Sequence, residues 1–104
     1  MKALVIVDLQ NDFLPGGSLA VPEGDQIIES INETMVNYDL IIATKDWHPL
    51  DHISFASNHQ NKKVGDKIRM NNIDQILWPN HCVQESFGSE FPKSLNFSKI
   101  KKVI

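Results

Sequence analysis

Residues 3–8 read ALVIVD, and residues 40–46 read LIIATKD. Each stretch is a continuous apolar run rich in β-branched residues, which is typical of a strand buried on both faces of a parallel sheet. Between the two runs, apolar residues recur at helical spacing, at Ile27, Ile28, Ile31 and Met35. This spacing predicts an amphipathic helix. Strand, helix and strand in this order predict a right-handed βαβ unit with parallel strands, and therefore an α/β fold.

Two carboxylates follow these predicted strands directly. Asp8 ends the first apolar run, and Asp46 follows the second. The carboxyl ends of parallel strands lie at the same edge of a sheet, and ligands of open α/β sheets bind at that edge. We therefore expect both aspartates at a functional edge of the sheet.

The rest of the chain is less regular. Residues 53–80 are rich in polar side chains, and we expect a long surface loop with one short helical piece near Ile73 to Leu77. The last four residues, KKVI at 101–104, predict the opening of a third strand. Because the sequence stops inside this strand, we expect a single domain over residues 1–104 whose carboxyl half is missing. An uncovered parallel sheet would favour a homo-oligomer.

Composition narrows the functional class. The net charge of −3 and the 22% of charged residues give no sign of a nucleic-acid or membrane partner. Cys82 is the only cysteine, so no internal disulfide can form. The apolar start of the chain is too short for a signal peptide or a membrane span. A cytoplasmic protein is the expectation.

Residues 46–48 read DWH, and residues 78–82 read WPNHC. In extended backbone, side chains at i and i+2 share a face, so Asp46 and His48 can point at one ion while Trp47 packs on the other side. His81 would complete the set from the long loop. One carboxylate with two imidazoles suits a catalytic transition metal, and zinc is the first choice, with iron or manganese as alternatives. The competing interpretation is that these are loop histidines without a ligand.

Two other histidines are less informative. His52 lies four residues after His48, where a helical turn could bring both onto one face. It could be a ligand, a partner of a ligand or a residue that shapes the loop. His59 lies among polar residues and is expected to be a surface residue.

Three stretches together resemble a known family. They are MKALVIVDLQNDFLPGGSLAVPEGD, TKDWHPLDHISFASNH and LWPNHCVQESFGSEF. In order and spacing they are similar to the amino-terminal half of nicotinamidases, also called pyrazinamidases, in the isochorismatase-like (cysteine hydrolase) superfamily. DWHP together with WPNHC is the specific part of this resemblance.

The resemblance implies a three-layer α-β-α fold around a parallel sheet, here incomplete, and hydrolysis of nicotinamide to nicotinate and ammonia in NAD salvage. Pyrazinamide-like analogues are further expected substrates. In the family, an aspartate, a lysine and a cysteine form a catalytic triad beside a metal site. Asp8 matches the triad aspartate, which exchanges protons with the substrate and with water. Asp46, His48 and His81 match metal ligands, and the metal orients the pyridine ring.

The same resemblance assigns Phe13 and Trp78 to the substrate pocket, with Gln10 on the same loop as Phe13. Core packing is the alternative for both aromatic residues. Asp12 is expected to structure this loop through backbone hydrogen bonds.

The chain departs from the family at two triad positions. The triad lysine and the nucleophilic cysteine have no counterparts in these 104 residues. Lys101 and Lys102 precede the apolar residues of the third strand, and Cys82 matches a structural position beside a metal ligand. Two alternatives to a nicotinamidase therefore stay open: a catalytically inactive metal-binding fragment, and a related isochorismatase-like hydrolase with another substrate.

Overall fold

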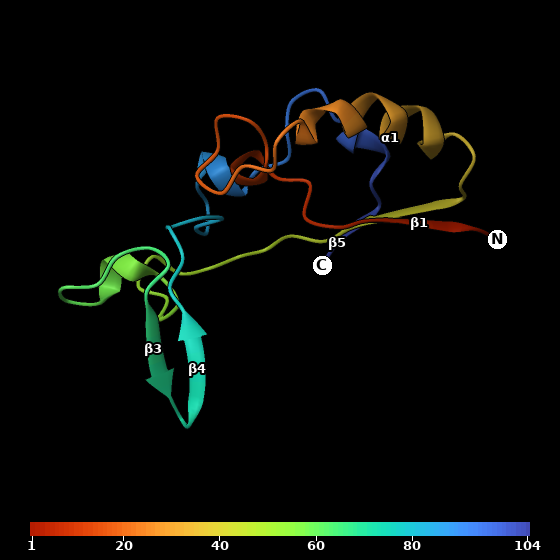
Figure 1. Ribbon diagram of the computed structural model, residues 1–104. Helices are drawn as coiled ribbons and strands as arrows, with labels where there is room; N and C mark the ends of the chain where they lie inside the picture. Colours follow the sequence, from red (N-terminus) through yellow and green to blue (C-terminus); the bar gives the residue numbers. More distant parts are fainter.

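The computed structural model describes residues 1–104 and contains one parallel sheet. Strand β1 covers Ala3–Ile6, β2 covers Leu40–Ala43 and β5 covers Lys102–Val103. The strand order is β1-β2-β5, and both neighbouring pairs are parallel. Helix α1, Ile27–Met35, connects β1 to β2 (Figure 1). The predicted βαβ unit and the predicted third strand are both confirmed.

Helix α1 covers one face of this sheet (Figure 1). The register places Leu4 beside Ile41 and Ile6 beside Ala43, so these side chains share the face that the helix covers. The buried core consists of Ile6, Leu9, Leu14, Ile28, Met35, Ile41, Ala43 and Leu95. Burial of this apolar surface is the main force that holds strands and helix together.

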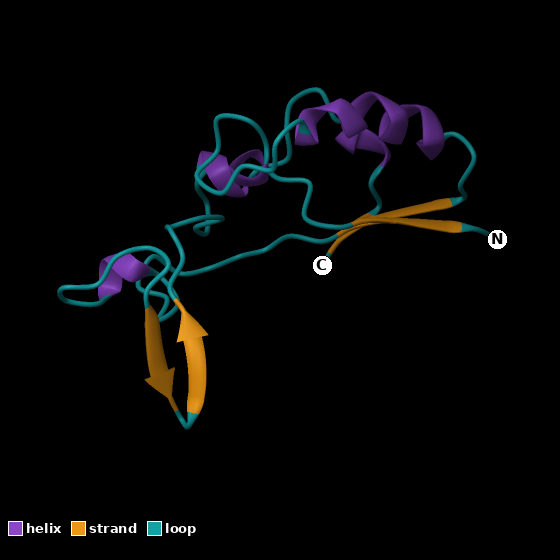
Figure 2. Ribbon diagram, viewed as in Figure 1, coloured by secondary structure: helices purple, strands orange, loops and turns teal.

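The opposite face of the sheet carries no helix (Figure 2). Val5 is 52% exposed and Val7 is 69% exposed. The prediction that the first strand is buried on both faces is therefore wrong for this chain. The continuous apolar run gives the strand two apolar faces, but helix α1 covers only one of them in the structure.

A hairpin extends away from the sheet and helix (Figure 1). Strand β3, Lys67–Met70, pairs antiparallel with β4, Ile73–Ile76. The helical piece expected near Ile73 to Leu77 is therefore wrong. Asn71 and Asn72 join the strands with φ values of 49° and 66°, and a two-residue loop with both φ positive is the turn that antiparallel hairpins favour.

The remaining helical segments are single 3₁₀ turns. They are η1 (Asn11–Phe13), η2 (Gly24–Gln26), η3 (Ala56–Asn58), η4 (Phe87–Ser89) and η5 (Phe97–Lys99). The molecule measures 49 × 27 × 21 Å, because the hairpin region and the α/β body lie at opposite ends (Figure 2). None of the helices is long and apolar enough to span a membrane.

Candidate metal centre

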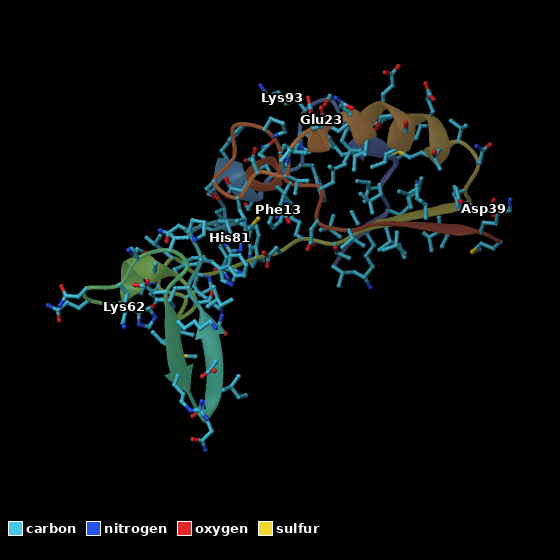
Figure 3. The ribbon with its side chains drawn as sticks, in the orientation of Figure 1. Phe13, Glu23, Asp39, Lys62, His81 and Lys93 are labelled. Carbon is cyan, nitrogen blue, oxygen red and sulfur yellow. The ribbon has the colours of Figure 1, made fainter.

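Two loop segments meet between the α/β body and the hairpin. One follows β2 and contains Asp46 and His48, and the other contains His81 and Cys82. The amide of His48 donates to the carbonyl of Cys82 at 2.9 Å, and the amide of Gln84 donates to the carbonyl of His48 at 2.8 Å. The segments therefore run side by side, and Figure 3 shows His81 at this junction.

The expected ligand side chains converge. Oδ1 of Asp46 lies 3.0 Å from Nε2 of His48, and Oδ2 of Asp46 lies 3.3 Å from Nε2 of His81. One donor atom from each of these residues lies within 4.8 Å of the others. Two atoms each about 2.1 Å from one zinc ion are about 3.4 Å apart at the tetrahedral angle. The arrangement could hold a divalent metal.

The ring orientation of His81 and the lowered pKa of His48 suit this role. Nδ1 of His81 lies 2.7 Å from the carbonyl oxygen of Pro79, to which it can donate its proton, leaving the lone pair of Nε2 directed at Asp46. Burial lowers the pKa of His48 below its ordinary value, against the opposing effect of the Asp46 carboxylate. Positive charge on His52 and His81 would lower it further. A neutral imidazole is the form that binds a metal.

His52 lies beside the centre, outside the set of converging donor atoms. Its ring stacks on His48 at a centroid distance of 4.6 Å and an interplanar angle of 14°. The amide of Ser54 donates to Nδ1 of His52 at 3.2 Å, and the Ser54 hydroxyl oxygen lies 2.7 Å from the same nitrogen. Ser54 therefore occupies Nδ1 of His52. His59 is partly exposed, and its Nε2 lies 2.6 Å from the carbonyl oxygen of Ile53, so it shapes the loop.

Phe55 is a site residue that sequence reasoning missed. It is fully buried, and its ring lies 5.4 Å from both His48 and His81 and 5.6 Å from His52. An apolar ring beneath the imidazoles excludes water from one side of the centre. The only sequence signal is an aromatic residue inside a polar stretch.

Asp8 ends β1 in an unusual backbone conformation. Its φ is 52°, a left-handed value that is uncommon outside glycine. The hydroxyl of Thr44 donates to Oδ1 of Asp8 at 2.8 Å, and the amide of Asp8 donates back to that hydroxyl oxygen at 3.1 Å. This exchange with the end of β2 fixes the carboxylate at the carboxyl edge of the sheet, where the sequence predicts it.

The two expected pocket residues lie in different surroundings. Phe13 and Asp8 line a common cavity of about 150 Å³, and the ring of Phe13 lies 5.9 Å from that of His81. Figure 3 shows Phe13 and His81 next to each other. Trp78 is 41% exposed, and its backbone pairs with the segment around Phe55. It does not line the cavity of Asp8 and Phe13.

Cys82 has the properties of a structural residue. Its side chain is fully buried and its φ is 48°. Burial, reinforced by the carboxylates of Asp46, Asp12 and Asp8, raises the pKa of its thiol to about 12. Such a thiol stays protonated at neutral pH and is a poor nucleophile.

The fold and the site define a parallel α/β protein with a candidate metal centre at the carboxyl edge of its sheet. No protein-family model matches the sequence. The nicotinamidase of Acinetobacter baylyi is 47% identical over 102 residues, which cover 98% of this chain and 48% of that protein. The chain spans about half the length of the curated relatives it matches.

Solved structures give the same result. The Acinetobacter baumanii nicotinamidase/pyrazinamidase matches with a TM-score of 0.90 and 44% identity over 98% of this chain and 49% of that chain. The yeast nicotinamidase bound to the inhibitor nicotinaldehyde gives 0.82 and 37%, covering 98% and 55%. The Pyrococcus horikoshii pyrazinamidase in complex with zinc gives 0.70 and 40%, covering 98% and 49%.

Along nearly its whole length the chain is similar to nicotinamidases and fits an amino-terminal portion of that family, and its incomplete parallel α/β fold matches their solved structures. The resemblance expected from DWHP and WPNHC is confirmed.

Proposed function

We propose that this chain supplies the metal centre and the acid/base aspartate of a nicotinamidase, which hydrolyses nicotinamide to nicotinate and ammonia. The convergence of Asp46, His48 and His81 carries the proposal. These side chains come from segments more than thirty residues apart in the sequence, yet their donor atoms have the spacing of ligands around one ion. Identity to nicotinamidases along nearly the whole chain supports the same activity.

Zinc is the metal we propose for this centre. A carboxylate with two imidazoles suits zinc, iron and manganese, and a related pyrazinamidase was solved in complex with zinc. Bound there, the ion would act as a Lewis acid and orient a heteroaromatic substrate. Asp46 would supply the negative charge, and a set of only three protein ligands, Asp46, His48 and His81, would leave coordination positions open.

Asp8 would move the proton in this reaction. Its carboxylate accepts one hydrogen bond from Thr44 and lines a cavity with Phe13, so it is oriented and still accessible. We propose that it accepts a proton from the nucleophile and returns it to the leaving ammonia. The nucleophilic thiol and the triad lysine would come from residues outside this chain.

The proposed substrate is a small aromatic amide such as nicotinamide or pyrazinamide. Phe13 would stack on the ring in the cavity that it shares with Asp8. The nicotinaldehyde-bound yeast relative supports a ligand of this size. We also propose a cytoplasmic location and a homo-oligomer, the latter because the sheet leaves Val5 and Val7 exposed.

A hybrid enzyme tests the proposal. Residues 1–104 would replace the matching half of the Acinetobacter baylyi nicotinamidase, with zinc supplied and ammonia release from nicotinamide as the measurement. The hybrid should be active, and Asp8→Asn, His48→Ala and His81→Ala should each lower kcat/KM by at least about 100-fold. Full activity in the His48→Ala and His81→Ala hybrids would contradict the proposal.

A second function applies to the 104 residues by themselves. The only thiol is buried with a pKa of about 12, so the isolated chain offers no cysteine thiolate for amide hydrolysis. It would then act as a metal-binding protein without turnover. Zinc binding without ammonia release by the isolated chain is the expected result, and ammonia release would exclude this alternative.

A further inference from the structure

One short segment after β1 holds both ligand-bearing loops. Residues 10–12 include Gln10 and Asp12, whose side chains reach the backbone at Asp46 and at Cys82, next to His81. We propose that Gln10 and Asp12 are positioning residues that set the metal affinity of the centre. This inference rests on the proposed metal binding and adds residues that do not themselves contact the ion.

The side chain of Gln10 forms hydrogen bonds with the backbone of Asp46. Its side chain is fully buried, and its Oε1 accepts from the amide of Asp46 at 2.8 Å. Its Nε2 donates to the carbonyl of Asp46 at 2.8 Å and to the carbonyl of Ser89 at 2.9 Å. Both polar groups of one peptide residue are thus bound by one side-chain amide. A shift or rotation of the Asp46 backbone would strain or break two partly buried hydrogen bonds.

The carboxylate of Asp12 binds the loop that contains His81 and Cys82. Its Oδ2 accepts from the amide of Cys82 at 2.8 Å, and its Oδ1 accepts from the amide of Ser18 at 3.3 Å. Cys82 directly follows His81 and has a φ of 48°. An L-residue in this conformation needs support from its surroundings, and the Asp12 carboxylate provides it. Asp12 therefore binds backbone amides both in its own loop and beside His81.

The hydrogen bonds of Gln10 and of Asp12 both affect the distances between the metal-ligand atoms. The Asp46 carboxylate oxygens lie 3.0 Å from Nε2 of His48 and 3.3 Å from Nε2 of His81. The backbone at Asp46 is hydrogen-bonded to Gln10, and the backbone next to His81 is hydrogen-bonded to Asp12. Zinc holds its ligands at about 2.0 to 2.2 Å with little tolerance. A small displacement of either loop would therefore weaken binding, although all three ligand side chains would still be present.

Three variants and two matched controls test this inference. Gln10→Leu removes the amide that grips Asp46, while Asp12→Asn and Asp12→Ala remove one or both carboxylate acceptors. Asn32→Leu is the control for Gln10, because Asn32 also donates to a carbonyl, of Ser94, and accepts from an amide, of Asn96, away from the centre. Asp66→Asn is the control for Asp12, because Asp66 accepts from the amide of Lys63 in the hairpin region.

The measurement is Zn²⁺ affinity of the 104-residue chain by calorimetric titration, together with the visible absorption of the Co²⁺-loaded chain. Loss of an outer partner of a metal ligand weakens binding by about 10- to 100-fold. We expect this loss for Gln10→Leu and Asp12→Ala, a smaller loss for Asp12→Asn, and a change of less than about twofold for both controls. The Co²⁺ absorption should shift in the Gln10 and Asp12 variants alone, since a general loss of stability would not change the ligand geometry of folded molecules.

The outcomes separate this inference from the proposed function. Wild-type affinity and an unchanged Co²⁺ spectrum in the Gln10 and Asp12 variants would overturn the positioning role while leaving the metal centre intact. A wild-type chain that binds neither Zn²⁺ nor Co²⁺ would overturn the proposed function, and the positioning role with it. If Gln10→Leu loses its folded circular dichroism spectrum, the graded series from Asp12→Asn to Asp12→Ala decides the question.

Discussion

The α/β body and the metal centre are held together by different forces. In the body, α1 covers one sheet face, and the contacts are apolar, as between Ile6, Met35 and Ile41. At the centre, the loops are held by directed hydrogen bonds from Gln10 and Asp12 to backbone groups. Apolar packing depends on volume and tolerates small shifts, whereas hydrogen-bonded loops hold atoms at set distances. The body should therefore determine stability, and the centre should determine affinity.

The largest expected effect is a loss of stability from the body. Met35 is 2% exposed in the core, and Met35→Ala should lower the free energy of unfolding by about 2 to 5 kcal/mol because it leaves a cavity. Urea denaturation followed by circular dichroism measures this change. The Zn²⁺ affinity of the folded fraction should stay within about twofold of wild type. A large change in that affinity would show that the two regions are not separable.

The next effect concerns Gly88, where adding a single methyl group should weaken metal binding at the centre. A Cβ at Gly88 would lie 2.0 Å from Oδ2 of Asp12, so Gly88→Ala must displace the carboxylate that binds the amide of Cys82. We expect Zn²⁺ binding to weaken by about 10- to 100-fold in calorimetric titration. Gly24→Ala is the control, because its Cβ would make ordinary contacts at 3.4 to 3.5 Å. Equal affinities in both variants would contradict the link from Asp12 to His81.

A smaller effect follows from the buried thiol of Cys82. The pKa of this thiol is raised from 9.0 to about 12, so the folded state keeps the proton where the unfolded state has lost it. The stabilising effect is complete below pH 9 and is lost as pH rises toward 12, since the unfolded state then binds fewer protons. At pH 10 the cost is about 1 kcal/mol relative to pH 8.

Urea denaturation of wild type and Cys82→Ala at pH 8 and pH 10 isolates this contribution from other titrating groups. The difference between the two proteins should change by that amount between the two pH values. Iodoacetamide should also label Cys82 in the folded chain only slowly. Fast labelling at pH 8 would mean that the loop around His81 opens readily.

The smallest effect is expected at the hairpin. Arg69 pairs with Asp74 at 2.9 Å, but both side chains are about two-thirds exposed. Arg69→Ala should change the free energy of unfolding by less than about 1 kcal/mol and leave Zn²⁺ affinity unaltered. Thermal denaturation and calorimetric titration measure the two quantities. An effect on affinity would imply that the hairpin helps to place the loop of His81.

Hydrophobic patterning was enough to predict the body. The runs at 3–7 and 40–44 and the helical spacing around Ile31 define β1, β2 and α1, because burial depends on local periodicity. The same patterning failed at residues 73–77, where Asn71 and Asn72 provide the turn of a hairpin. The two asparagines were the available signal, and the apolar residues after them were read with the wrong period.

The candidate centre was predictable in part. The i and i+2 spacing predicted that Asp46 and His48 lie together, His81 was expected to complete the set from the long loop, and the resemblance matched all three to metal ligands. The positioning roles of Gln10 and Asp12 were not predictable, since their contacts join residues 36 and 70 positions apart. The stacking of His52 on His48 and the burial of Phe55 also depend on the folded loop, which has no regular period.

Asp46, His48 and His81 are proposed to bind one divalent metal. The most direct measurement is X-ray diffraction at the zinc absorption edge from crystals grown with Zn²⁺, compared with crystals of the His81→Ala chain. We expect one strong anomalous peak within about 2.3 Å of an oxygen of Asp46 and of Nε2 of both histidines, and the loss of this peak in the variant. A peak elsewhere, or none at these residues in the wild-type crystals, would contradict the proposed metal binding.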